Sequence, residues 1–294
     1  MQQDPGALRA WVQASRLPTL WAAFAPVAVG TACAARTGCF DAYAAGLCLL
    51  GAVLIQLGTN YANDLFDFRK GADGRDRLGP TRAVAAGWLT ERAMMTGTVV
   101  AFAAATLVGV ELVRLAGWPI VIIGVTSLAA GILYTAGPAP FAYTGLGDVF
   151  VMLFFGFVAV CGTAFVQCGS VPATAWLGSV AVGSLATAIL VVNNLRDHAG
   201  DRRARKRTLV VRFGGEFGRA ELVSLIALAY LVLFAFWWWG APGALLGALS
   251  LPLAWRAIDD GTRLRGAELN PVLGRVARLQ MVFCVLLAAG LAFL

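Results

Sequence analysis

Charged side chains are scarce in this sequence. They account for 13% of its 294 residues, against 59% hydrophobic residues, and the mean hydropathy is +0.76. Soluble domains carry about 25% charged residues. The composition therefore excludes an ordinary soluble globular domain and predicts a chain that crosses a membrane several times.

The sequence also lacks the repeated alternation of apolar and polar residues that a membrane β-barrel requires. Backbone polar groups inside lipid must be satisfied within the chain, so the apolar stretches are expected to be helices of roughly 20 residues. The sequence predicts an all-α fold, a polytopic membrane bundle of nine transmembrane helices in a single domain over residues 1–294. The nine stretches are Leu17–Ala35, Tyr43–Tyr61, Ala93–Val113, Trp118–Ala136, Leu146–Val166, Ala175–Val192, Leu222–Trp239, Ala241–Trp255 and Val276–Leu294.

Cysteine spacings typical of metal sites are missing as well. None of the six cysteines forms a C-x-x-C pair, and most lie inside apolar stretches. We therefore expect them to be small apolar packing residues. They are Cys33, Cys39, Cys48, Cys161, Cys168 and Cys284.

Basic residues are distributed unevenly along the chain. Arg9 and Arg16 precede an apolar run as long as a full span, without an ending typical of signal-peptide cleavage, so we expect this segment to be retained. With the N-terminus inside, 21 of the 23 basic residues fall on one side and only Arg36 and Arg114 on the other. The eighth stretch is short and contains Pro252, but without it five of these arginines would move outside. The positive-inside rule then predicts a multi-pass protein of the plasma (inner) membrane, with the N-terminus and basic loops cytoplasmic and the C-terminus on the opposite side.

Two polar motifs follow apolar runs, after the second and the sixth predicted helix. The first motif consists of Asn60, Asp64 and Asp67, and the second of Asn193, Asp197 and Asp201. Their spacings of i, i+4 and i+7 or i+8 put each set on one face of a helix. Both helices would end at the motifs, where the helix dipole is negative, so the carboxylates need a compensating cation. Their hard oxygen ligands suit Mg²⁺, which commonly binds through one or two carboxylates and substrate phosphates.

Lysine is almost absent, and its two occurrences, Lys70 and Lys206, each follow one of the acidic motifs. These lysines and nearby arginines could neutralise a diphosphate whose charge the metal only partly offsets. The arginines are Arg77, Arg82, Arg202 and Arg207. The alternative for these cations is a role in membrane topology alone, and for the aspartates a capping or salt-bridged role at the membrane interface.

Three stretches of the chain resemble sequences of the UbiA-type intramembrane aromatic prenyltransferases, within that family the branch that acts on 1,4-dihydroxy-2-naphthoate. They are NYANDLFDFRKGADGRDRLGPTR, YTAGPAPFAYTGLGD and NNLRDHAGDRRARKRTLVVRFG, and the similarity runs from Arg16 to the C-terminus. The family pattern is N-D-x-x-D-x-x-x-D, and here Gly71 occupies its last position. The naphthoate branch usually carries Asp two residues later, which is Asp73 here.

The resemblance implies a central cavity between the helices, capped on the cytoplasmic side by the two motif loops. The diphosphate of a polyprenyl donor would bind there through Mg²⁺, and the isoprenoid tail would lie in an apolar groove open to the lipid bilayer. The prenyl group would be transferred to the ring carbon of 1,4-dihydroxy-2-naphthoate that bears the carboxylate, with loss of CO₂. The product would be demethylmenaquinol, which oxidises to demethylmenaquinone, a step of menaquinone biosynthesis. No nucleic acid is expected among the partners.

The expected site comprises three sets of residues. The catalytic set is Asp64, Asp67, Asp197, Asp201 and Tyr134; the metal ligands are Asn60, Asp64, Asp67, Asp73, Asn193, Asp197 and Asp201; the substrate-binding set is Lys70, Arg77, Arg82, Asp148, Arg202, Lys206 and Arg207. Tyr134 is placed near the allylic cation by the resemblance, and an aromatic role at the membrane interface is its alternative. Asp148 would contact metal or acceptor, or else cap the helix that begins there. His198, the only histidine, points away from the face of the second motif and is not expected to be a ligand.

Two other functions are considered. Intramembrane Asp and Asn residues and a parallel repeat of helices also occur in cation-coupled transporters, but transporter sites lie near the midplane of the membrane, whereas these acids gather at one interface. Within the family, 4-hydroxybenzoate or homogentisate could replace the naphthoate as acceptor. The naphthoate-type loop sequences favour the first assignment.

Overall fold

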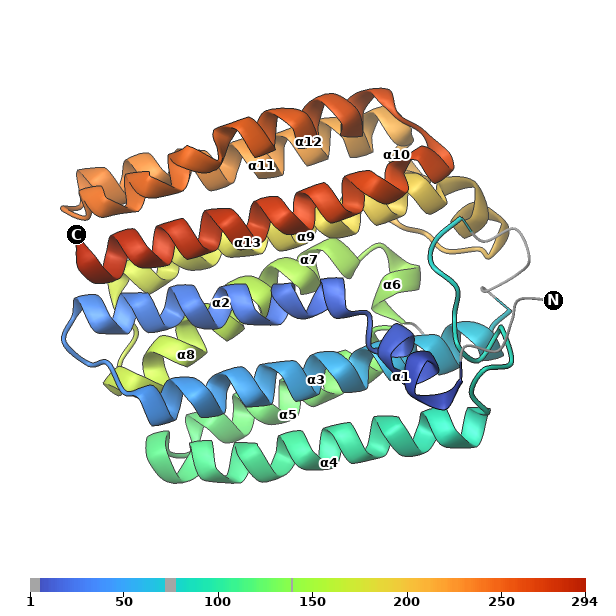
Figure 1. The fold of residues 1–294 in the computed structure, drawn as a ribbon, viewed down its shortest axis with the longest axis horizontal. Coiled ribbons are helices and arrows are strands. Elements are labelled where there is room, and N and C mark those ends of the chain that lie inside the picture. Colours follow the sequence, from blue (N-terminus) through green and yellow to red (C-terminus); the bar gives the residue numbers. More distant parts are fainter. Residues whose placement is uncertain (1–5, 72–77, 139) are drawn as a thin grey trace.

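The longest helix, α9 (Ala173–Arg203), lies at the centre of an all-helical bundle (Figure 1). The computed structural model describes residues 6–71, 78–138 and 140–294, and these residues contain no β-strand. Of the apolar window of α9, 72% is buried inside the protein, the largest share of any candidate span. The helices α2, α8, η1, α11 and α13 surround it.

In chain order the elements are α1 (Ala7–Ser15), α2 (Leu17–Arg36), α3 (Ala42–Arg69), α4 (Glu91–Ala116), α5 (Pro119–Leu133), α6 (Phe141–Thr144), α7 (Gly147–Val151), η1 (Met152–Val158), α8 (Ala159–Cys168), α9, α10 (Leu209–Phe213), α11 (Gly215–Trp238), η2 (Pro242–Ser250), α12 (Leu251–Arg263), η3 (Gly266–Leu269) and α13 (Asn270–Phe293).

Every apolar stretch predicted from the sequence lies in a helical element. Among the described residues, six helices are long and apolar enough to cross a membrane, and a seventh span results if the bent pair α1 and α2 is counted as one. The fourth stretch forms the shorter helix α5, and the eighth is divided between the 3₁₀ helix η2 and α12. The all-α class and the multi-pass membrane protein are therefore confirmed, while the count of nine crossings stays a prediction.

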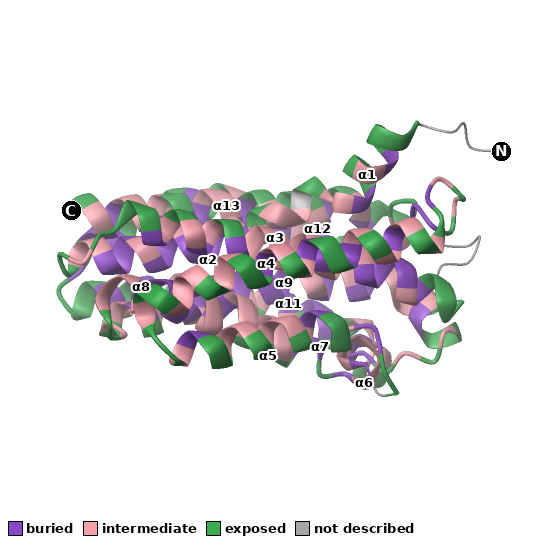
Figure 2. Cartoon of the chain, turned by 90° about the horizontal axis from the view of Figure 1, so that it is seen from below, coloured by how far each residue is buried: buried purple, intermediate pink, exposed green. Residues whose placement is uncertain are grey.

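The helices bury small and aliphatic residues against one another and expose large apolar residues outward (Figure 2). The largest core cluster joins α9 to α2, α8, α11 and α13. Leu107 and Trp255 are each 73% exposed on the outer surface. An outer surface of this kind suits a lipid environment, in which apolar side chains need no cover.

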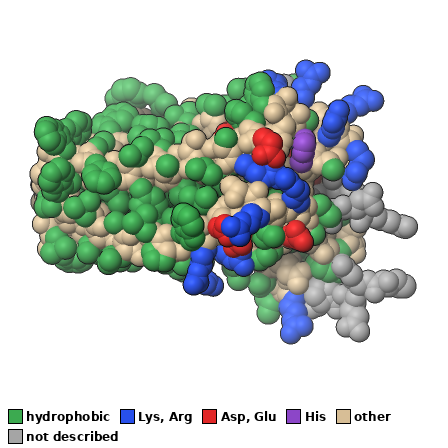
Figure 3. Space-filling model, turned by 90° about the horizontal axis from the view of Figure 1, so that it is seen from above, with side chains coloured by type: hydrophobic (Ala, Val, Ile, Leu, Met, Phe, Trp, Pro, Cys, Tyr) green, Lys and Arg blue, Asp and Glu red, His purple; other side chains and the backbone are tan. Residues whose placement is uncertain are grey.

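Charged side chains gather at one end of the bundle. On the face shown in Figure 3, the Lys, Arg, Asp and Glu side chains lie toward one end, and apolar side chains cover the rest. The short helices α1, α6 and α10 lie at this charged end (Figure 1), where α3 and α9 also end. The two polar motifs are thus brought to the same end of the protein.

A close backbone contact holds η1 against α9. The π-helix η1 places Gly156 so that an added Cβ would lie 2.6 Å from the carbonyl oxygen of Ser179. On the facing helix, a Cβ at Gly183 would lie 3.0 Å from the carbonyl oxygen of Met152. Real Cβ atoms essentially never show a distance of 2.6 Å, so Gly156 requires glycine for packing, and a Cβ at Gly183 would make an unusually tight contact.

We predict that Gly156→Ala destabilises the protein, because the added methyl group has to push η1 away from α9. Overpacking of this kind costs roughly 1–3 kcal/mol. Gly46→Ala is the matched control, since Gly46 is an exposed helical glycine with open space around it. Because alanine favours the helix over glycine, Gly46→Ala is expected to leave the free energy of unfolding unchanged or to raise it by up to about 1 kcal/mol. Thermal unfolding in detergent measures both, and an unchanged Tm for Gly156→Ala would contradict the packing argument.

Candidate active site

A cavity of about 2120 Å³ runs through the bundle and contains both polar motifs at one end. Its lining comes from the helices α1 to α9, from η1 and from α13. Beyond the motifs the lining is mainly apolar and reaches Val166 near the opposite end of α8. Val110 and Val125 also line it and are 50% and 61% exposed, so the cavity opens sideways between helices toward the surrounding lipid.

Asp64, in the first motif, is buried and holds the connection that follows α3. Its two carboxylate oxygens accept hydrogen bonds from the backbone N–H groups of Ala83 (3.0 Å) and Val84 (3.1 Å). Two such bonds stabilise the charged form of a carboxylate and order the turn that donates them. Asp64 therefore shapes the loop over the cavity, in addition to supplying negative charge there.

Asp67, one helical turn later, is surrounded by cations and a phenol. Arg82 Nη2 donates to its Oδ2 at 3.0 Å, and both residues are buried. Tyr143 Oη donates to Oδ1 at 3.0 Å, and Lys206 Nζ lies 3.9 Å from the same oxygen. Because Lys206 follows the second motif, this contact joins the two motifs.

The second motif is organised by Arg196, which is buried beside it. Its guanidinium binds Asp197 through two hydrogen bonds, Nε to Oδ1 at 2.8 Å and Nη2 to Oδ2 at 2.6 Å. It also donates to the side-chain oxygens of Asn193 (2.6 Å) and Asn270 (3.2 Å). Planar two-point binding is the geometry in which arginine is strongest. Asp197 is thus paired within the protein.

Asp201 completes the second motif and faces Asp67 across a lysine. Lys206 Nζ lies 3.5 Å from Asp201 Oδ1 and 3.9 Å from Asp67 Oδ1. One protein cation therefore lies between a carboxylate of each motif. This position is the natural one for a metal–phosphate complex that binds both motifs.

The ring of Tyr143, on α6, lies between the two lysines. The Nζ atoms of Lys70 and Lys206 are each 4.8 Å from its centroid. Lys70 Nζ also donates to the carbonyl of Thr135 at 2.7 Å. Burial lowers the pKa of the Lys70 ammonium, the charge of Asp67 opposes this shift, and the charge of Lys206 adds to it. Cation–π contacts and the hydrogen bond to Asp67 let Tyr143 hold both ammonium groups at the polar end of the cavity.

The loop after α3 is fastened to both motifs. Ala83 and Val84 bind Asp64, as described, and Asn270 Nδ2 donates to the carbonyl of Leu78 at 2.8 Å. A Cβ at Gly79 would lie 2.6 Å from Arg196 Nη2, so the loop backbone lies directly on this guanidinium. The described part of the loop therefore covers the charged end of the cavity.

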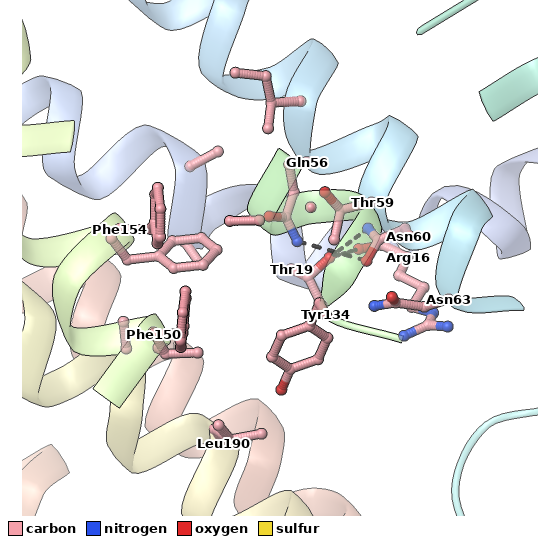
Figure 4. A pocket seen from close by; sticks show the side chains of 18 of the residues that line it. Arg16, Thr19, Gln56, Thr59, Asn60, Asn63, Tyr134, Phe150, Phe154 and Leu190 are labelled. Atoms are coloured by element: carbon pink, nitrogen blue, oxygen red, sulfur yellow. Dashed lines mark hydrogen bonds between the residues drawn. The ribbon is translucent and has the colours of Figure 1, made fainter. Parts of the chain in front are cut away.

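Figure 4 shows the pocket beside the motifs, with polar side chains on one side of Tyr134 and aromatic ones on the other. Phe150 and Phe154 belong to a stack that begins at Phe141. Asn60 lines the same cavity, and its Nδ2 donates to the carbonyl of Ser15 (3.0 Å) and to Thr19 Oγ1 (2.9 Å). In this structure Asn60 fastens α3 to the junction of α1 and α2.

Asp148 lies in the first turn of α7, as expected, and lines the cavity. It makes no side-chain capping bond, and its buried Oδ1 has no hydrogen-bond partner among the described residues. Tyr134 is close by, since its Oη would lie 3.6 Å from a Cβ at Gly147. The structure therefore directs a carboxylate and a phenol into the same part of the cavity.

Four predicted site residues are left untested by the structure. Asp73 and Arg77 are outside the described residues. Arg202 and Arg207 are exposed, whereas the described cavity lining includes Arg203 and Lys206. The metal contact assigned to Asp73 and the substrate contacts assigned to the other three residues stay predictions.

Sequence reasoning missed residues that the structure brings to the site. Tyr143 sits in a segment rich in proline and glycine that has no periodic pattern, and its proximity to the lysines required the fold. Arg196 directly precedes Asp197, so motif spacing placed it off the shared face. Arg16 lines the cavity with φ of 49°, a left-handed conformation that is rare for a residue with a side chain. In the sequence Arg16 begins an Arg-x-Pro at the start of an apolar run, a pattern that does not distinguish a site residue from an arginine at the membrane interface.

The oxygen ligands at this end of the cavity are of the kind that Mg²⁺ requires. The four aspartates of the motifs line one cavity end, and Lys206 shows that a cation fits between Asp67 and Asp201. The described residues contain no group of three or more Asp, Glu, His or Cys side chains arranged around one metal position. The residues thus fit a Mg²⁺ ion that shares its coordination with substrate phosphates.

Comparisons with known proteins agree with this arrangement. The chain is 38% identical to 1,4-dihydroxy-2-naphthoate octaprenyltransferase of Mycobacterium tuberculosis over 287 residues, which cover 96% of this chain and 97% of the relative. It is also 38% identical to the enzyme of the same name from Escherichia coli over 252 residues, 81% of this chain and 82% of the relative. A solved structure of a UbiA homolog from Archaeoglobus fulgidus bound to DMAPP and Mg²⁺ superposes with a TM-score of 0.69, at 16% identity, and covers 97% of this chain and 99% of that one.

The family assignment rests on most of the chain. The sequence matches the UbiA prenyltransferase family over residues 23–270, which include both motifs, α6 and the loop that covers the cavity. The chain therefore belongs to the UbiA prenyltransferase family.

Proposed function

We propose that this chain transfers a polyprenyl group from polyprenyl diphosphate to 1,4-dihydroxy-2-naphthoate, with loss of CO₂, as a step of menaquinone biosynthesis. The observation that carries the proposal is the polar end of the cavity. There Lys70 and Lys206 converge on Tyr143 beside Asp67 and Asp201, while the rest of the cavity is apolar and open to lipid. A charged diphosphate and a long apolar tail need this combination of surroundings. The relatives named above carry the corresponding enzyme name.

The donor binds with its diphosphate at the motifs. Mg²⁺, held by the aspartates of both motifs and by the diphosphate itself, would neutralise charge on the leaving group. Lys70 and Lys206 donate hydrogen bonds to phosphate oxygens and stabilise the charge that develops as the allylic C–O bond breaks. Tyr143 keeps the two ammonium groups in place, and Arg82 supports Asp67.

The aromatic acceptor lies deeper, near Tyr134 and Asp148. A new C–C bond forms between the allylic carbon and the ring carbon that bears the carboxylate. The bond from that ring carbon to the carboxylate then breaks, its electron pair restores the aromatic ring, and CO₂ leaves. Phe150 and Phe154 help to keep water away from the allylic cation, which water would otherwise capture.

The proposed orientation puts the charged end of the bundle in the cytoplasm and the protein in the plasma (inner) membrane. The charged end contains both motifs, at the ends of α3 and α9, and the basic loops that follow them, and the positive-inside rule assigns such loops to the cytoplasm. The aromatic acid would then reach the site from the cytoplasm. The donor would place its charged diphosphate at the cytoplasmic end of the site, while its isoprenoid tail stays in the membrane.

Acceptor choice tests the proposed reaction. Purified protein in lipid is given a labelled polyprenyl diphosphate with 1,4-dihydroxy-2-naphthoate or with 4-hydroxybenzoate. We expect rapid prenylation of the naphthoate with one CO₂ released per prenyl group, because only that acceptor loses its carboxylate at the attacked carbon. Faster turnover of 4-hydroxybenzoate would assign the chain to another acceptor branch of the family.

We predict that Asp201→Asn lowers kcat/KM by at least about 100-fold, since it removes charge from the carboxylate pair that would bind Mg²⁺. Folding should be preserved, because the described contact of the Asp201 side chain is the ion pair with Lys206. Glu111→Gln at the opposite end of the bundle is the matched control and should retain activity. Chelator should silence the wild-type protein and added Mg²⁺ should restore it; full activity in excess chelator would exclude the metal.

Substitutions at Tyr143 separate its ring from its hydroxyl. Tyr143→Phe keeps the ring near both lysines and loses the hydrogen bond to Asp67. We therefore expect kcat/KM to fall a few-fold, which corresponds to about 1 kcal/mol. Tyr143→Leu loses the ring too, and the KM for the donor should rise by about 10-fold or more. Tyr43→Leu, at the opposite end of the bundle, is the control. A wild-type KM for the donor in Tyr143→Leu would show that the ring does not position the lysines.

A further inference from the structure

Two partly exposed cysteines meet at the end of the bundle farthest from the motifs. Cys39 lies in the turn between α2 and α3, and Cys168 is the last residue of α8. The hydroxyl of Thr37 joins them, with Oγ1 3.4 Å from Cys39 Sγ and 3.5 Å from Cys168 Sγ. The shared contact with Thr37 brings the two thiols to the same place on the surface.

The turn is fastened to α8 by a second contact. The backbone N–H of Asp41 donates to Gln167 Oε1 at 3.2 Å. Asp41 in turn accepts hydrogen bonds from the first N–H groups of α3, at 2.8 Å from Tyr43 and 3.1 Å from Ala44. The position of Cys39 relative to Cys168 is therefore set by the ends of α3 and α8, and not by the thiols alone.

The other four cysteines differ from this pair because they are buried within the helices. A soluble reagent can reach Cys39 and Cys168 but not the buried thiols. Hydrogen bonds from Cys168 and Thr37 lower the pKa of the Cys39 thiol, and the thiolate is the reactive form. The described residues offer no group of three metal-binding side chains, so the pair is better suited to redox chemistry than to metal binding.

We propose that Cys39 and Cys168 are a disulfide-forming pair, oxidised by thiol–disulfide exchange with a disulfide reagent or protein at that face of the membrane. The Cys39 thiolate attacks one sulfur of the oxidant, whose S–S bond breaks and releases one thiol. Cys168 then attacks Cys39 Sγ in the mixed disulfide and releases the second thiol. The pair loses two electrons and two protons, and the oxidant gains both as two thiols.

The bond would join the α2–α3 turn to the end of α8, residues far apart in the chain. Cross-links over long loops restrict the unfolded chain more than those over short loops. Val166 and Cys48 line the far end of the cavity nearby, so the cross-link would brace the apolar end of the groove. This inference does not depend on the reaction proposed for the motifs.

The test uses full-length protein in detergent or lipid, treated with glutathione disulfide. Free thiols are blocked with N-ethylmaleimide under denaturing conditions, disulfides are reduced, and the new thiols are labelled with maleimide-polyethylene glycol. We expect two labels per chain after oxidation. No internal bond can form in Cys39→Ser or Cys168→Ser, so each should give at most one label, from a mixed disulfide with glutathione. Both labels should remain in the matched control Cys161→Ser, whose cysteine is buried. The Tm of the oxidised wild-type protein should exceed that of the reduced protein by about 5 °C or more.

Peptide mass spectrometry of the unsubstituted protein gives an answer that does not depend on variant folding. A cross-linked peptide that contains Cys39 and Cys168 supports the proposal. Two free thiols at these positions after oxidation would overturn it, as would a reductant-sensitive dimer in place of the internal bond. An internal bond without a change in Tm would overturn the bracing role.

Discussion

Negative charge at the ends of two helices is the constraint on which the site depends. Both α3 and α9 end at the motifs, where their dipoles are negative, and each carries two aspartates there. Like charges this close would repel, so the protein surrounds them with donors of different kinds. Backbone N–H groups bind Asp64, Arg82 and Tyr143 bind Asp67, Arg196 binds Asp197, and Lys206 lies beside Asp201. These contacts also fasten the covering loop and α6 to the bundle.

The same distribution of charge divides the cavity into two environments. Carboxylates and ammonium groups lie at one end, where the proposed reaction needs them for the charged part of the donor, and the uncharged lining extends from there past Phe150 and Phe154. In a low-dielectric setting a misplaced charge is costly, so the substrate is oriented before any bond breaks. The change from a charged to an apolar lining along α9 therefore accounts both for which substrate the cavity suits and for which way round that substrate would lie.

Much of this arrangement could be predicted from the sequence. Apolar runs located the helices, and i, i+4 spacing located the aspartates, because both depend on local geometry. Which side chains neutralise the aspartates depends on long-range contacts, so Tyr143 and Arg196 were missed. Asn60 illustrates the limit: its spacing predicted its place on α3, but not its hydrogen bonds to the α1–α2 junction. Likewise, the prediction that cysteines are apolar packing residues fits the four buried ones. It does not fit Cys39 and Cys168, which a tertiary contact brings together.

The π-helix η1 has a consequence for the upstream part of its span. A π-helical turn accommodates one residue more than an α-helical turn, so everything before it is rotated by about 100° relative to an uninterrupted α-helix. In this chain the preceding turn carries Asp148 and Phe150, both of which line the cavity. The direction in which Asp148 and Phe150 point around the helix axis is thus set by the extra residue of the π-helical turn within Met152–Val158, and not by which side chains occupy these positions. Length changes in this segment are accordingly more disruptive to the pocket than most substitutions within it.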